Sequence, residues 1–144
     1  MRYREVIRMP LWLLALIYFF FLSFVLSVWA ALGNSAAIAT LLAMSALLAV
    51  IAVRSRLVIE ITETELKVGP AHIELKYVGT ALVLDSDAMR KIRTRDANPI
   101  AYLGIRFWSS TGVKVEINDK RDETPYWLIT SNKANQLVNA LTLN

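Results

Sequence analysis

The fold is decided by residues 10–53, which read PLWLLALIYFFFLSFVLSVWAALGNSAAIATLLAMSALLAVIAV. No charged residue occurs in this stretch, and its apolar character is interrupted only at Gly33-Asn34-Ser35. At a rise of about 1.5 Å per residue, residues 10–32 would span roughly 34 Å and residues 36–53 roughly 27 Å, close to the hydrocarbon thickness of about 30 Å. The stretch therefore predicts a transmembrane hairpin with helices at about 10–32 and 36–53.

Positive charge flanks the predicted hairpin on both sides and is missing from its turn. The flanking cations are Arg2, Arg4, Arg8, Arg54 and Arg56. Because cytoplasmic loops of membrane proteins are enriched in Lys and Arg, both termini are predicted to be cytoplasmic, in a multi-pass protein of the plasma membrane. A cleaved signal peptide is the alternative, but its apolar core of about 7–15 residues would be shorter, and a second apolar run would not follow at once.

The basic character of the chain comes from these flanks. The isoelectric point is near 9.6, yet residues 57–144 contain equal numbers of basic and acidic residues, so this part is neutral. The charge pattern therefore argues against a nucleic-acid partner and favours attraction to anionic lipid headgroups of the bilayer. The absence of cysteine excludes disulfides and thiolate metal sites, and no metal or cofactor motif is found, so no cofactor is expected.

Small residues recur at helical spacing in both predicted membrane helices. They are Ser23, Ser27 and Ala31 in the first helix and Ala39, Ala43 and Ala46 in the second. Such strips let helix backbones approach closely in lipid, which predicts that the two helices pack through them. The frequency of Ala and Ser in membrane helices explains the strips equally well, and assembly into a homo-oligomer stays open. Because no ionisable residue lies within the helices, the hairpin is expected to be an anchor rather than a channel.

From Leu57 onward the hydrophobic pattern changes to the two-residue period of strands. Seven strands are predicted, and residues 100–108 are expected to pair with residues 113–117 as a hairpin. A short helix capped by Asp85 or Ser86 follows the fourth strand, and a final amphipathic helix is expected to be capped by Ser131.

Two parts follow from these elements: a two-helix transmembrane hairpin over residues 1–56 and a β-rich cytoplasmic domain over residues 57–144. The predicted fold class of the domain is α+β, mainly antiparallel β. It is expected to form a bent sheet or open barrel of about seven strands, closed at one end by the C-terminal helix. This arrangement resembles the pleckstrin-homology-like architecture, an analogy of fold that carries no function.

Several segments, in order and spacing across nearly the whole chain, resemble one family of small actinobacterial membrane proteins. The matching segments are Tyr3-Arg4-Glu5, Ala71–Leu75, Asp96–Leu103, Arg106–Trp108, Asp119–Asp122 and Thr124–Ser131. The family is known only as a domain of unknown function (domain of unknown function 3093). The resemblance implies two membrane helices followed by a cytoplasmic domain, and it implies no activity.

Aromatic and charged residues near the late strands form the candidate partner-binding surface. They are Asp96, Arg106, Trp108, Pro125, Tyr126 and Trp127. Aromatic residues and arginine are enriched in interfaces, although Trp and Tyr fill sheet cores equally well. Because successive strand residues point to opposite faces, one ring of Tyr126 and Trp127 is expected in the core and the other on the outer face.

The short helix carries the candidate headgroup-binding residues. They are Arg90, Lys91, Arg93 and Arg95. An anchored domain can use such a cluster to contact anionic headgroups. The alternative is a solvated face whose cations pair in part with Asp85, Asp87 and Asp96.

No residue set predicts catalysis, so the chain is not expected to be an enzyme. The only histidine, His72, alternates with Glu74 on a strand and is expected to face solvent. We therefore predict a membrane-anchored interaction or scaffold protein that binds an unknown protein partner or a lipid headgroup at the inner membrane face. The alternatives are a membrane-surface enzyme that uses His72 or Asp96, and an accessory subunit of a transporter.

Overall fold

The computed structural model describes residues 1–143, which form two compact units. The first unit is the helical hairpin, residues 8–56. The second unit, called the domain below, combines residues 1–7 with the chain from Leu57 onward. Residues 1–7 were expected to belong to the hairpin, so the domain differs from the expectation at its N-terminal end.

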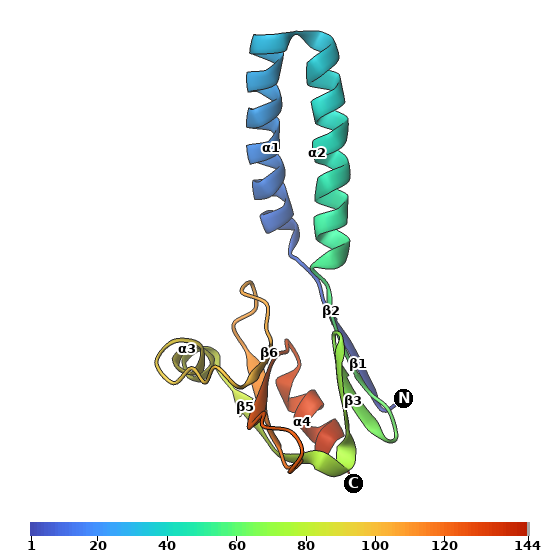
Figure 1. Cartoon of the computed structure of the whole chain (residues 1–144), viewed down its shortest axis with the longest axis vertical. Coiled ribbons are helices and arrows are strands. Elements are labelled where there is room, and N and C mark those ends of the chain that lie inside the picture. The colour runs from blue at the N-terminus through green and yellow to red at the C-terminus, as the bar shows by residue number, and fades with distance from the viewer. Residues whose placement is uncertain (144) are drawn as a thin grey trace. The chain divides into compact units, whose positions relative to one another are not determined.

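The hairpin consists of α1 (Leu11–Leu32) and α2 (Asn34–Arg54), which lie side by side in Figure 1. Both are long and apolar enough to cross a membrane. Gly33 alone connects them, with a φ of +87° that other residues rarely adopt. Because one glycine reverses the chain, Asn34 and Ser35 belong to α2 and the predicted three-residue turn is too long.

Residues outside the predicted small-residue strips lie on the facing sides of the two helices. The half-buried positions of α1 include Ile17, Tyr18, Phe21, Val25 and Val28. The predicted strips are exposed, namely Ser23, Ser27, Ala31, Ala39, Ala43 and Ala46. The expectation that the strips join α1 to α2 is therefore wrong, because other positions face the partner helix, among them Ala37 and the pair Tyr18 and Ser45, whose hydroxyl oxygens lie 3.5 Å apart.

The first sheet of the domain is antiparallel throughout, with the strand order β1-β2-β3-β4. Its strands are β1 (Tyr3–Ile7), β2 (Leu57–Ile61), β3 (Glu65–Val68) and β4 (Ala71–Glu74). Strand β1 was missed by the sequence analysis. It pairs with β2 from Tyr3 opposite Ile61 to Ile7 opposite Leu57, so the hairpin is inserted between two neighbouring strands.

The second sheet is mixed, with the order β5-β7-β8-β6. A 3-10 turn at Leu75–Tyr77 leads into it, and its strands are β5 (Val78–Leu84), β6 (Tyr102–Gly104), β7 (Gly112–Ile117) and β8 (Tyr126–Thr130). Strand β6 runs parallel to β8, while β7 lies between β5 and β8. The predicted pairing of residues 100–108 with 113–117 is therefore wrong. The strand is short because Arg106 N donates to the Thr130 hydroxyl (2.9 Å) instead of extending the ladder.

One hydrophobic core fills the space between the inner faces of both sheets and helix α4 (Ala134–Thr142). Leu137 and Leu141 of α4 are buried in it, as the amphipathic pattern predicts. Helix α3 (Ser86–Thr94) covers the other face of the second sheet, where Met89 packs with Leu84 and Leu128. The described strands thus form two sheets, rather than the single bent sheet or open barrel that the sequence predicts.

The two predicted helix caps have different outcomes. The Asp85 carboxylate accepts a hydrogen bond from Ala88 N (2.8 Å) and caps α3, which confirms the prediction. Ser131 does not cap α4, whose first flanking residue is Lys133. The Ser131 hydroxyl instead donates to Glu5 Oε2 (2.6 Å), because β1 brings a carboxylate to this position.

Glu5 is a buried carboxylate on β1, only 7% exposed, that joins the two ends of the domain. It accepts hydrogen bonds from the Tyr3 hydroxyl (2.8 Å), the Ser131 hydroxyl (2.6 Å) and Asn132 N (2.9 Å). Within residues 1–143 it forms no ion pair with Lys or Arg, so these three donors alone compensate its burial. Burial, and then the hydrogen bond to Glu5, raises the pKa of Tyr3.

Substitution Glu5→Ala is expected to lower the free energy of unfolding of the domain by about 3 kcal/mol, because three donors to a charged acceptor lose their partner. Chemical denaturation of the detergent-solubilised chain measures the loss, and amide exchange of residues 3–7 locates it. The control is Glu65→Ala, which breaks only the exposed pair with Lys67 (3.6 Å) and should cost less than about 1 kcal/mol. Equal losses in the two variants would contradict the role assigned to Glu5.

Candidate functional site

The cations of α3, taken together with Arg95 just after it, separate into an exposed group and one inward-facing residue. Arg90, Lys91 and Arg95 are exposed, and none forms an ion pair within the described residues. The pairing with Asp85, Asp87 and Asp96 that would neutralise this face is therefore not observed. The exposed side of α3 presents uncompensated positive charge to solvent, as a headgroup-contacting surface requires.

Arg93 turns toward the second sheet instead. Its Nη2 atom donates to the carbonyl oxygen of Ser109 (3.2 Å) and lies 3.4 Å from the Thr130 hydroxyl. Its Nε atom is buried and has no hydrogen-bond partner in the described structure. Burial lowers the pKa of Arg93, since the charged guanidinium is partly removed from water without a carboxylate beside it.

Tyr126 and Trp127 point to opposite faces of β8, as predicted. Trp127 is 5% exposed and packs in the core, with its ring centroid 5.0 Å from that of Tyr102. Tyr126 is half-buried on the outer face, where Lys114 Nζ lies 4.6 Å from its ring centroid. Of the two rings, only Tyr126 is therefore available to a partner.

The remaining predicted partner-binding residues do not converge. Asp96 and Pro125 are exposed in separate loops, and Arg106 is half-buried with its Nη1 atom bonded to the carbonyl of Ile105 (2.9 Å). Trp108 packs against the core from a turn, and its Nε1 atom is buried without a hydrogen-bond partner in the described residues. The structure thus does not assemble these residues into one cleft.

An exposed ring next to them was missed by the sequence analysis. Phe107 is 72% exposed and stacks edge-on against Trp108, with 5.1 Å between ring centroids. It was expected in the strand over residues 100–108, but it occupies a turn after β6. Its exposure follows from the early end of that strand, which no local pattern indicates.

His72 lines a shallow, polar pocket of about 230 Å³ together with Tyr77, Asp119, Arg121 and Asp122. Arg121 bonds to both the Asp119 carboxylate (3.1 Å) and the Tyr77 hydroxyl (2.9 Å), and its hydrogen bonds lower the pKa of Asp119. Asp119 is thereby held as an ion-paired group and does not orient His72, which is exposed as predicted. Asp96 does not line this pocket. In residues 1–143 no group of three or more acidic or histidine side chains could hold a metal ion.

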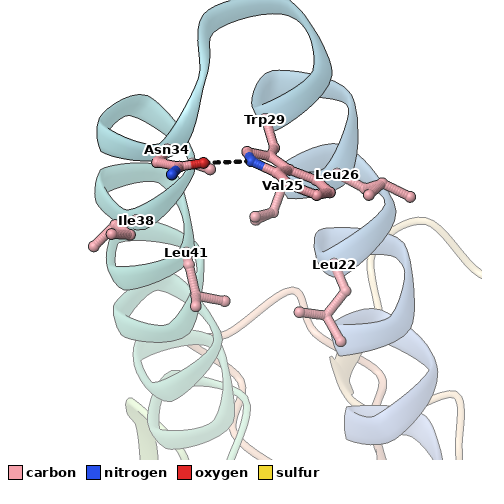
Figure 2. Close-up of a pocket in the computed structure, with 8 residues that line it drawn as sticks. Leu22, Val25, Leu26, Trp29, Asn34, Ile38 and Leu41 are labelled. Atoms are coloured by element: carbon pink, nitrogen blue, oxygen red, sulfur yellow. Dashed lines mark hydrogen bonds between the residues drawn. The ribbon is translucent and has the colours of Figure 1, made fainter.

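The hairpin carries an apolar groove of about 370 Å³ near its turn, shown in Figure 2. Its one polar feature is a hydrogen bond from the Trp29 indole N–H to Asn34 Oδ1 (2.6 Å). The remaining lining is apolar, with Leu22, Val25 and Leu26 from α1 and Ala37, Ile38 and Leu41 from α2. A groove with this lining accommodates hydrocarbon rather than a polar substrate.

These features define a class of protein: an apolar two-helix hairpin inserted into a small two-sheet domain that carries an unpaired basic helix. The chain belongs to the family described as protein of unknown function (DUF3093), whose model matches residues 2–141. No curated protein and no solved structure matches the chain. The family assignment confirms the resemblance inferred from the sequence.

Because Trp127 and Tyr126 lie on opposite faces of β8, truncation of the two side chains should lower the free energy of unfolding by different amounts. Trp127→Ala is expected to lower the free energy of unfolding by about 3–5 kcal/mol, because it leaves a large cavity in the core. Tyr126→Ala should cost only about 1–2 kcal/mol, because its half-buried ring loses less contact. Chemical denaturation of both variants checks this order, with Tyr126→Phe as the control that keeps the ring. A Trp127→Ala variant as stable as Tyr126→Ala would contradict the assignment of Trp127 to the core.

Proposed function

We propose that the protein is a membrane-anchored interaction module whose domain binds an anionic lipid headgroup or a protein partner at the inner membrane face. The observation that carries the proposal is the combination of an uncharged, exposed helical hairpin with unpaired cations on α3. Of the two classes of ligand, the cations favour the headgroup.

The exposure of the hairpin supports the membrane anchor. Only Leu13 of α1 and Ala37 of α2 are buried, although both helices are strongly apolar. A core helix of a water-soluble protein passes the same test of length and composition but is mostly buried. Phenylalanines such as Phe19, Phe20 and Phe24 remain exposed and would contact lipid tails. The flanking arginines support the cytoplasmic placement of both termini.

Two short connections support a tethered mode of action. Three residues separate β1 from α1 and two separate α2 from β2. A domain held by such connections meets ligands of the same membrane at a high effective concentration, so a modest affinity suffices. We also propose that the domain has a pleckstrin-homology-like fold. Its many strands and its C-terminal helix support this.

The rival functions have less support. An enzyme would need a base that a second residue orients, whereas the His72 imidazole has no hydrogen-bond partner in the described structure. A transporter subunit would need a polar path between the helices, whereas the groove in Figure 2 is apolar apart from one satisfied hydrogen bond.

The lack of cysteine allows a direct test of the topology, because a single introduced thiol can be labelled. Ser35→Cys, at the hairpin turn, is expected to react with a membrane-impermeant maleimide on intact cells. Thr64→Cys, in an exposed loop of the domain, should react only after permeabilisation. Labelling of Thr64→Cys on intact cells would overturn the cytoplasmic placement of the domain.

Removal of the α3 cations tests the headgroup contact. The triple variant Arg90→Gln/Lys91→Gln/Arg95→Gln should lose about 3 kcal/mol of attraction to anionic lipid, at about 1 kcal/mol per residue. The measurement is amide exchange of residues 86–95 in nanodiscs that contain phosphatidylglycerol, compared with pure phosphatidylcholine. The wild-type protein should be protected only by the anionic lipid, and the triple variant by neither. The matched control, Lys67→Gln with Lys120→Gln and Lys133→Gln, removes the same charge elsewhere and should behave as wild type.

A further inference from the structure

A small cavity lies behind the exposed cations, between α3, the segment after it and the second sheet. Its volume is about 50 Å³. It is lined by Ile92 and Arg93 of α3, Ala97 and Asn98 of the following loop, Leu103 and Ile105 at β6, and Tyr126 of β8. None of these residues is acidic, although residues 57–144 contain as many acidic as basic residues.

Three residues that line the cavity carry hydrogen-bond donors for which no protein partner is found in the described structure, and solvent reaches these three donor atoms. The Nη1 atom of Arg93 donates no hydrogen bond, since its contacts to Ser109 and Thr130 use Nη2. The carboxamide oxygen of Asn98 accepts from Ile100 N (3.0 Å), which leaves its NH₂ group as a donor. The Tyr126 hydroxyl completes the set. A guanidinium, a carboxamide and a phenol around one space are the groups that bind an oxyanion.

Size and charge favour a small oxyanion as the ligand. At about 10–15 Å³ for each water, the cavity holds roughly three to five waters, the size of an oxyanion rather than of a whole nucleotide or lipid. The cations nearby are Arg90 and Lys91 of the same helix, Arg95 just after it, and Lys114 over the Tyr126 ring, while Asp85 and Asp87 lie at the opposite, N-terminal end of the helix. The charge of these cations opposes the partial negative charge at the end of α3 and the exposed carboxylate of Asp96.

We propose that this cavity binds the phosphate group of a phosphomonoester or free phosphate, with Arg93, Asn98 and Tyr126 as its donors. A bound dianion supplies the charge partner that Arg93 lacks and offers an oxygen to each donor. The inference deepens the proposed function only where the source of the phosphate is a lipid headgroup. The same chemistry applies to phosphate from solution.

The experiment uses the full chain in phosphatidylcholine nanodiscs, titrated with inorganic phosphate by isothermal calorimetry. Wild-type protein should bind phosphate. Arg93→Gln should weaken binding at least ten-fold, and Tyr126→Phe, which keeps the ring and its packing, about five-fold. Arg90→Gln removes the same charge from the exposed side of α3 and should change binding less than two-fold. If Arg90→Gln and Arg93→Gln weaken binding equally, or wild type does not bind phosphate, the cavity is overturned as a site.

A second arm separates the two sources of phosphate. Nanodiscs with phosphatidic acid, a phosphomonoester, are compared with nanodiscs of equal charge that contain phosphatidylglycerol, and amide exchange of residues 86–98 is measured. Extra protection by phosphatidic acid that Tyr126→Phe removes supports the lipid source, and phosphate binding without it supports the solution source. If phosphatidylglycerol protects these residues but the protein does not bind phosphate, the proposed headgroup contact stands and the proposed phosphate site is wrong. If phosphate binds through Arg93 but neither lipid protects these residues, the phosphate site stands and the proposed headgroup contact is wrong.

Discussion

The buried carboxylate of Glu5 is the interaction on which the organisation of the chain depends. It attaches β1 to the connection between β8 and α4 through Ser131 and Asn132. Because an ionised group is costly to bury, its three donors have to be in place together, and they come from both ends of the domain. The first residues of the chain thereby become a strand of the domain rather than a leader to the membrane helices. The hairpin is then an insertion between paired strands, and its two ends are held at Ile7 and Leu57.

The two faces of the second sheet have different roles. The inner face, with Trp127 and Ile129, is used for the core. The outer face carries α3, which approaches closely because Gly112 has no side chain. A Cβ at Gly112 would collide with the carbonyl of Ile129 and lie 2.7 Å from the Met89 Cε. This contact fixes the helix, so that Arg93 faces the sheet while its other cations face solvent.

The proposed role follows from the separation of an apolar anchor from a nearly neutral domain with one basic surface. A domain with a large net charge would be drawn to any anionic surface, whereas this one concentrates its unpaired cations on α3. The groove of the hairpin and its exposed small-residue strips face lipid in this proposal. Small residues on an outward face also leave room for close approach of another helix, which keeps self-association compatible with the anchor.

The sequence by itself determined the features that depend on local periodicity and composition. The two apolar helices, most strands from Leu57 onward, the Asp85 cap and the opposite faces of Tyr126 and Trp127 all follow from a few neighbouring residues. Family membership was likewise recognisable from short segments.

Only the tertiary structure decided the pairing of distant segments. In it, β1 pairs with β2 across the hairpin, β6 runs parallel to β8, and the predicted small-residue strips lie on exposed sides of the helices. The inward turn of Arg93 belongs to the same group of outcomes. The physical reason is that these choices depend on contacts between residues far apart in the chain, such as Glu5 with Ser131. A polar residue at a core position gives no local sign of the donors that will surround it.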